Sequence, residues 1–167
     1  MPYQSGKIIF VPPLLLRHRV RSRHGAASVF ERLVGSLILP EQLLPPHDIQ
    51  SVKYFTARIS ARASDPQAPT RQQAYLRALA TRPKVRIFYG HYTSHEVTLP
   101  LADTTPMRFA RVIRTDEKGS DVNLAVHLVD DCHTLTLDSV VVVTNDSDLA
   151  EALRIAKGLG KNVGILN

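Results

Sequence analysis

Three aspartates have the residue type and the spacing that metal-assisted chemistry needs. Asp146 and Asp148 follow the apolar run Val140–Val143 within a few positions, and Asp121 comes directly after Gly119–Ser120. Such a run is typical of a buried parallel strand, and ligands bind beyond the carboxyl ends of such strands. Carboxylate oxygens are preferred ligands of Mg²⁺ and Mn²⁺, which polarise phosphates and activate water. We therefore predict a Mg²⁺ or Mn²⁺ site in which all three aspartates are both metal ligands and catalytic residues.

Helix capping is the alternative role for these aspartates. Aspartate and serine are preferred helix N-caps, and an aspartate in a first turn complements the helix dipole. Each aspartate alone is more often a cap than a ligand. One aspartate is enough to cap a helix, but here two lie together and a third lies at a neighbouring helix start. This arrangement favours the metal site. A zinc site is a weaker alternative, because its histidines lack the glutamate of the HExxH pattern; its ligands would be His91, His95, Cys132 and His133.

The C-terminal third contains the elements that must position these carboxylates. Residues Asp138–Thr144 read as a strand, a helix runs from Asp148 to Gly160, and "NVGIL" reads as the next strand. Strand, helix and strand with short links form a right-handed βαβ unit, which predicts an α/β fold with a parallel sheet. A further helix is predicted over Gly119–Cys132. Its expected inward stripe is Val122, Ala125, Val126 and Val129.

The upstream sequence contains three further strand patterns and two helical ones. Strands are predicted at Lys7–Val11, Ile49–Ser60 and Lys84–Tyr92. A helix is predicted over Arg71–Thr81, with Tyr75, Leu76 and Leu79 facing inward, and Val29, Leu33 and Leu37 also have helical spacing. Residues 93–110 show no period and are predicted to be irregular.

Length and composition restrict the class of protein. The chain has 167 residues, which suits one domain with a substantial core. Its one cysteine, Cys132, excludes an internal disulfide and fits a reducing compartment, and we expect it to be a small buried side chain. No apolar run is long enough for a membrane span, and the early apolar segment is interrupted by two prolines. These features predict a cytoplasmic protein with no membrane partner.

The charge distribution indicates a nucleic-acid partner. Residues 1–114 contain 17 Lys/Arg and 6 Asp/Glu, a net charge of +11, whereas residues 115–167 contain 4 and 9, a net charge of −5. The basic residues include the arm Arg17–His24. A basic body beside an acidic cation site is the pattern expected of a protein that binds a phosphate backbone. We predict contact with RNA, single-stranded or structured, and leave a homo-oligomer open.

Several stretches resemble one family in the right order. They are "SVKYFTARIS", "DPQAPTRQQAYLRAL", "VRIFYGHY", "TDEKGSDVNLAVHLVDD" and "DSVVVVTNDSDLAEALRIAKGLGKNVGILN". Over residues 37–167 the chain resembles NYN-domain proteins of the LabA-like branch of the PIN-like nucleases. This implies a Rossmann-like (PIN-like) three-layer fold with a central parallel sheet and a divalent-metal-dependent ribonuclease activity. The family's middle aspartate maps onto Asp121 and its later acidic pair onto Asp146 and Asp148. Neighbouring polar matches, expected to contact RNA, are Lys118, Ser120, Asn123 and Asn145.

One departure from the family concerns the N-terminus. The family opens with a strand that ends in Asp-Gly-x-Asn, whereas "KIIFVPP" ends in prolines. Residues 1–36 therefore form a divergent basic segment before the domain. We expect a ribonuclease impaired by loss of the first acidic residue, with Arg58 and Arg71 holding the RNA backbone. The alternatives are a non-catalytic RNA-binding or regulatory module and a Toprim-like domain, for which Glu96 is a poor second carboxylate.

Overall fold

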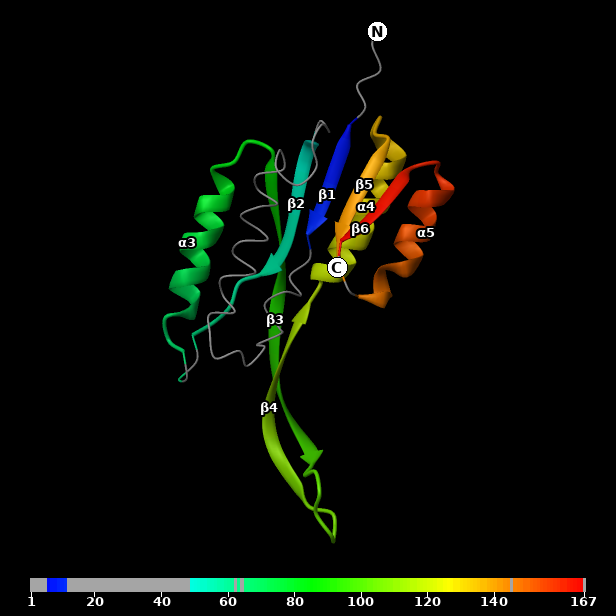
Figure 1. Cartoon of the computed structure of the whole chain (residues 1–167). Coiled ribbons are helices and arrows are strands. Elements are labelled where there is room, and N and C mark those ends of the chain that lie inside the picture. Colours follow the sequence, from blue (N-terminus) through cyan, green and yellow to red (C-terminus); the bar gives the residue numbers. More distant parts are fainter. Residues whose placement is uncertain (1–5, 12–48, 62, 64, 145, 167) are drawn as a thin grey trace.

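A six-stranded sheet with helices on both faces forms the body of the molecule (Figure 1). The computed structural model describes residues 6–11, 49–61, 63, 65–144 and 146–166. The strands are β1 (Lys7–Val11), β2 (Ile49–Ala57), β3 (Val85–Pro100), β4 (Phe109–Lys118), β5 (Ser139–Val143) and β6 (Asn162–Leu166). The helices are α3 (Ala68–Ala80), α4 (Ser120–Thr134), the 3₁₀ helix η2 (Ser147–Leu149) and α5 (Ala150–Gly158).

The strand order is β4-β3-β2-β1-β5-β6, and every pair is parallel except β3 and β4. The predicted α/β fold is confirmed, but the sheet is mixed because β4 returns antiparallel to β3. Strand β1 lies in the middle, between β2 and β5. The chain continues from β1 to β2 on one side and later reaches β5 on the other side, so the strand order reverses beside β1. In open α/β sheets, ligands bind at such a reversal of strand order.

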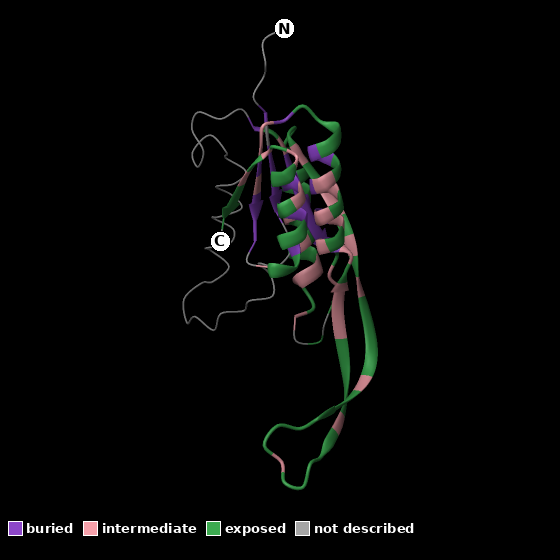
Figure 2. Cartoon of the chain, turned by 90° about the vertical axis from the view of Figure 1, so that its right-hand side faces the viewer, coloured by how far each residue is buried: buried purple, intermediate pink, exposed green. Residues whose placement is uncertain are grey.

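The buried core has two parts, one on each face of the sheet. Figure 2 shows buried residues along the strands in the body of the sheet. The alternation of β1 produces this division: Ile8 and Phe10 pack under α4 and α5, while Ile9 and Val11 face α3. Leu76 and Leu79 of α3 are buried as predicted. Cys132 is buried in the α4 part, as expected, and this burial raises the pKa of its thiol.

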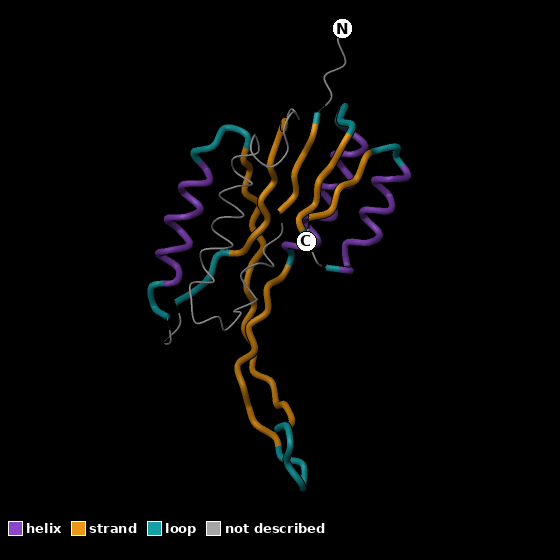
Figure 3. Tube along the Cα trace, viewed as in Figure 1, coloured by secondary structure: helices purple, strands orange, loops and turns teal. Residues whose placement is uncertain are grey.

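A long two-stranded ribbon replaces the irregular segment predicted for residues 93–110. Pairing between β2 and β3 ends at Ala57 and Gly90, but β3 continues to Pro100 and pairs with β4 as far as Phe109 (Figure 3). Most residues of the ribbon are exposed (Figure 2). No layer of the core packs against these residues to impose an alternation of apolar and polar side chains, so their strand pattern is weak. The prediction was wrong for residues 93–100 and 109–110, and it was right for the irregular segment 101–108.

Helix α4 forms as predicted, but it faces the sheet with different residues. Leu124 and Leu128 are fully buried, whereas Val122 and Val126 are 66% and 61% exposed. The expected stripe was therefore wrong for these two valines. The helix is rotated so that a line with i,i+4 spacing, Leu124 to Leu128 to Cys132, faces inward. Two members of the expected stripe pack against the edge of the core: Ala125 and Val129.

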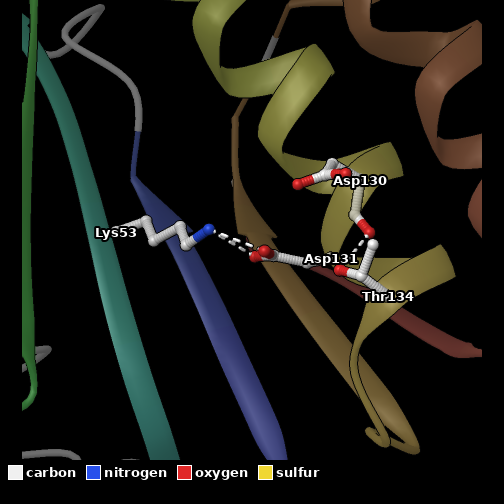
Figure 4. A network of polar contacts seen from close by, with 4 residues as sticks. All are labelled: Lys53, Asp130, Asp131 and Thr134. Atoms are coloured by element: carbon white, nitrogen blue, oxygen red, sulfur yellow. Dashed lines mark hydrogen bonds and ion pairs between the residues drawn. The ribbon is translucent and has the colours of Figure 1, made fainter.

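A buried ion pair accompanies this orientation of α4. Lys53 of β2 and Asp131 of α4 are both almost fully buried, and the Lys53 Nζ lies 2.7 Å from Asp131 Oδ1 and 2.6 Å from Oδ2 (Figure 4). The ammonium group lies 5.9 Å from the ring centre of Phe10 and 5.5 Å from that of Phe88. Burial of a charged pair is unfavourable unless the two charges meet, so the pair fixes where α4 lies along β2.

Some predictions concern residues outside the described part of the chain. These are the basic arm Arg17–His24, the helical spacing of Val29, Leu33 and Leu37, most of the segment 1–36, and Asn145. Among the helices that the structure describes, none is both long and apolar enough to cross a membrane.

Candidate active site at the carboxyl edge of the sheet

Three helices begin at the edge where the parallel strands end (Figure 1). Helices α3, α4 and η2–α5 each run back along the sheet, so their first turns lie at this carboxyl edge. The edge therefore includes Asp121 in the first turn of α4, and Asp146 and Asp148 at the start of η2. The sequence prediction that these three aspartates lie at one edge agrees with this arrangement.

Asp146 caps a helix. Its Oδ1 atom accepts a hydrogen bond of 2.9 Å from the backbone N–H of Asp148, and its backbone is extended, as expected of an N-cap. Its own N–H donates to Thr144 Oγ1 over 2.9 Å. The capping role considered for this residue is therefore present. A carboxylate has further lone pairs, so capping does not prevent Asp146 from binding a cation.

Replacing Asp146 by alanine should lower the free energy of unfolding by about 1 kcal/mol, because the N–H of Asp148 loses its acceptor. Asparagine at the same position should leave stability nearly unchanged, since its amide oxygen also caps. Asp148→Ala removes no cap and is the matched control. Urea denaturation without added metal measures all three. Equal losses for Asp146→Ala and Asp146→Asn would contradict the capping role.

The described part of the chain contains no group of three or more His, Cys, Asp or Glu side chains arranged to hold a metal ion. Asp121, Asp146 and Asp148 have the donor chemistry that Mg²⁺ prefers, but they are not gathered into one such group. The zinc alternative is not formed either, since its four candidate ligands are all described. The three aspartates therefore do not by themselves complete a metal site.

The central strand supplies no carboxylate at the reversal of strand order. Strand β1 has the sequence KIIFV, and its last residue, Val11, pairs with Tyr54 of β2. Pro12 and Pro13 follow in the sequence. Strand β5 pairs with β1 on the other side, and Asp146 follows β5. At the reversal of strand order, β1 therefore ends in apolar residues, whereas β5 is followed by the acidic residue Asp146.

Glu117 was missed by the sequence analysis. It is the second-last residue of β4 and accepts hydrogen bonds from Tyr92 Oη at 3.2 Å and from Ser120 Oγ at 2.5 Å. Ser120 is only 2% exposed, so its hydroxyl orders the start of α4, and this burial does not support the expected contact with RNA. The signal in the sequence was an acidic residue three positions before the first residue of α4 and four positions before Asp121.

Three basic side chains expected to contact RNA belong to elements that start or end at the same edge. Arg58 follows β2 and places its guanidinium 4.8 Å from the ring centre of Tyr89. Arg71, in the first turns of α3, pairs with Asp65 at 2.5 Å, and both are substantially exposed. Lys118 ends β4 and is exposed. The remaining candidate, Asn123, is half-buried in the first turn of α4.

Comparison with known proteins gives one family and one curated relative. The family model for the NYN domain matches residues 43–167. The 6-hydroxy-3-succinoylpyridine 3-monooxygenase HspA of Pseudomonas putida is 35% identical over 118 residues, which are 64% of this chain. The chain spans 38% of the length of that relative. No solved structure matches the chain.

Proposed function

The chain belongs to the NYN domain family, and from this premise we propose that it acts on RNA as a PIN-like nuclease of the LabA-like branch. The observation that carries the proposal is that the family match spans β2 to β6 and includes Asp121, Asp146 and Asp148, all at the carboxyl edge of the sheet. The oxygenase activity in the name of the relative belongs to a protein of which this chain spans only 38%.

The proposed site lacks a carboxylate from its central strand. Family members open with a strand that ends in Asp-Gly-x-Asn, and β1, which precedes the matched region, ends in valine and is followed by prolines. Mg²⁺ requires near-octahedral geometry, and water in place of a carboxylate contributes no negative charge. We therefore propose that Asp121, Asp146 and Asp148 bind Mg²⁺ or Mn²⁺ weakly, and that cleavage is slow.

RNA would be held through its phosphates and bases at the same edge. Arg58 and Lys118 are exposed cations, and Tyr89 beside Arg58 offers a partly exposed ring on which a base can stack. Arg71 can contribute when it leaves Asp65, since an exposed pair is weak. These side chains position RNA electrostatically, so binding depends on salt.

A binding module without hydrolysis is the second candidate, and one observation favours it. Among the described residues, no three acidic or histidine side chains are arranged to hold an ion. If no ion is bound, the exposed cations Arg58 and Lys118 can still contact RNA, and the protein would then act as an RNA-binding or regulatory module.

A labelled single-stranded RNA tests both candidates in one titration. With Mn²⁺ we expect cleavage slower than about 1 s⁻¹, a typical enzymatic rate, and loss of cleavage on chelation or in Asp121→Asn. Binding should weaken with salt, with a log–log slope near −0.7 for each phosphate contact. Arg58→Ala should reduce that slope by about one contact.

The matched control is Arg77→Ala, because Arg77 lies in the last turn of the same α3 whose first turn is at the carboxyl edge. It should leave binding and cleavage unchanged. Retained binding with no cleavage at any Mn²⁺ concentration would favour the binding module. Binding that is absent at low salt, or insensitive to salt, would contradict both.

A further inference from the structure

The two faces of the ribbon formed by β3 and β4 differ in charge. Directly opposite residues of an antiparallel pair share a face, and successive residues of a strand alternate between faces. One face of the ribbon, which we call the basic face, therefore carries His91 with Lys118, Thr93 with Asp116, and His95 with Arg114. Beyond these pairs, the same face continues with Val97 opposite Val112. The opposite face carries Tyr92 with Glu117, Ser94 with Thr115, Glu96 with Ile113, and Thr98 with Arg111.

The basic face thus has more basic than acidic residues, and the opposite face has the reverse. Asp116 is the acidic residue of the basic face, and Arg114 Nε donates a hydrogen bond of 3.0 Å to its Oδ1 atom. This hydrogen bond lowers the pKa of the Asp116 carboxyl, the charges of Arg114, Lys118 and His95 lower it further, and desolvation raises it. The basic side chains therefore gather around this carboxylate and outnumber it.

The basic face continues from the RNA contacts proposed on the body of the sheet. Val85 and Ile87 of β3 pack against the part of the core that faces α3, and alternation places Tyr89 and His91 on the same side. The Arg58 guanidinium lies 4.8 Å from the ring centre of Tyr89. Twist turns the ribbon gradually but does not exchange its faces. Exposed polar and aromatic groups therefore continue from Arg58 onto the ribbon.

The ribbon leaves the body at the edge that contains the candidate active site. Pairing between β2 and β3 ends at Gly90, and β4 returns to Lys118, only three residues before Asp121. Figures 1 and 3 show the ribbon extending from this edge. From Tyr89 to His95 the strand rises about 20 Å. That matches about six stacked nucleotides, a usual length for a single-stranded site.

The chemistry of this face favours RNA over an acidic protein. Protein interfaces depend on apolar or aromatic anchor residues near their centre. Between Tyr89 and Val112, the basic face has no exposed large apolar side chain. An exposed ring beside a cation, as at Tyr89 and Arg58, suits a base next to its phosphate. Some nucleic-acid-binding proteins contact their ligand through β-ribbons.

We propose that the basic face of the ribbon binds the backbone of the RNA strand that reaches Asp121, with Arg114 as a phosphate contact and His91 and His95 as hydrogen-bond donors beside it. This proposal rests on the proposed function, and it extends the RNA-binding surface beyond the body of the sheet. Asp116 reduces the attraction, but its exposed pair with Arg114 is weak, so a phosphate can compete for the guanidinium.

Affinity for a labelled RNA of about sixteen nucleotides, the upper end of such sites, tests the proposal. The buffer contains no divalent ions, so cleavage does not interfere. Arg114→Ala in the full chain should weaken binding roughly fivefold at 0.1 M salt, the contribution of one phosphate contact with a slope near 0.7. Arg111→Ala is the matched control, because it breaks a similar exposed pair, with Glu96, on the opposite face. It should leave affinity unchanged.

Removal of the acidic residue should have the opposite effect. Asp116→Asn frees Arg114 and removes a negative charge from the basic face, so binding should tighten roughly twofold or more, as expected for an exposed charge interaction. Glu96→Gln makes the same kind of change on the opposite face and should not alter affinity. A gain of affinity in Asp116→Asn cannot arise from damage to the fold.

Modification of introduced thiols locates the RNA without a change of charge. Thr93 and Ser94 are adjacent, exposed and on opposite faces, and the native Cys132 is buried. RNA should slow modification of the thiol in Thr93→Cys but not in Ser94→Cys. Equal affinities of Arg114→Ala and Arg111→Ala, or equal protection of the two thiols, would overturn the proposal while RNA binding itself remains. A wild type that binds no RNA would overturn the proposed function, and the role of the basic face with it.

Discussion

Replacing Lys53 by methionine should lower the free energy of unfolding by about 3–5 kcal/mol, the usual effect of removing one partner of a buried ion pair. The change leaves the carboxylate of Asp131 almost fully buried, without the ammonium group now 2.6–2.7 Å from its oxygens. The loss of methylene contacts is small, since methionine is a flexible apolar side chain of similar length. Urea denaturation followed by circular dichroism measures the effect.

The surroundings of Asp131 make this effect large. Lys53 lies near the rings of Phe10 and Phe88, and the ring centres of Phe88 and His127 are 4.2 Å apart. Burial and the Lys53 ammonium lower the pKa of His127, whereas Asp131 raises it; without the ammonium, burial still disfavours the charged form of this ring. The carboxylate would therefore keep its charge without compensation or become protonated, and both outcomes destabilise the folded state.

The double variant Lys53→Met/Asp131→Leu separates the ion pair from ordinary packing. An apolar pair of similar volume should restore stability to the wild-type value or exceed it by about 1–4 kcal/mol. The control is Arg154→Met, which breaks the fully exposed pair with Glu151 and should leave unfolding unchanged. Two single losses that simply add in the double variant would show that Lys53 and Asp131 do not act as a pair.

The same ion pair explains where the sequence analysis failed on α4. The helix itself was predictable, because its apolar residues recur with helical spacing, but the inward face was assigned to valines. Charged residues are normally expected on the surface of a protein. The inward position of Asp131 could not be predicted from its neighbours in sequence, because its partner Lys53 is 78 positions away. Pairing at this separation has no local signal. Asp131 is buried on the same side of α4 as Leu124 and Leu128, and this orientation leaves Val122 and Val126 exposed.

Local patterns predicted most of the remaining fold and part of the candidate site. The apolar run of β5 and the cap at Asp146 are local, and both were predictable. The order of the strands, with β1 in the middle, depends on contacts distant in sequence. The same holds for Glu117, whose hydrogen bond to Tyr92 exists only because the ribbon returns along β3. The ribbon was missed because no core imposes a period on it.

Gly90→Ala should destabilise the protein by about 1–3 kcal/mol, the usual effect of overpacking. A Cβ atom at this position would lie 2.4 Å from the carbonyl oxygen of Lys118, 2.6 Å from Ser120 Oγ and 3.0 Å from the Ser120 nitrogen. Two of these atoms belong to the backbone. Lys118 is held in register by its pairing with His91, so it cannot move away without loss of the ladder.

The expected damage is local to the start of α4. Gly119 joins β4 to α4 with φ at +85°, a conformation that favours glycine, so this junction has little freedom to adjust. The first helical hydrogen bond, from the Asn123 N–H to the Gly119 carbonyl at 2.8 Å, should open more often. Hydrogen exchange at the Asn123 amide measures that opening, and urea denaturation measures the global effect.

The matched control for this clash is Gly164→Ala, in another strand of the same sheet. A Cβ atom there would meet Val141 Cγ2 at 3.5 Å, an ordinary contact, so this variant should fold with nearly unchanged stability. Because Asp121 follows the displaced junction by two residues, Gly90→Ala should also impair any RNA cleavage, and Gly164→Ala should not. Gly90→Ala and Gly164→Ala could instead show the same free energy of unfolding and the same hydrogen exchange at Asn123. The junction at Gly119 would then adapt to the added methyl group, and the close approach of β3 to the start of α4 would not position Asp121.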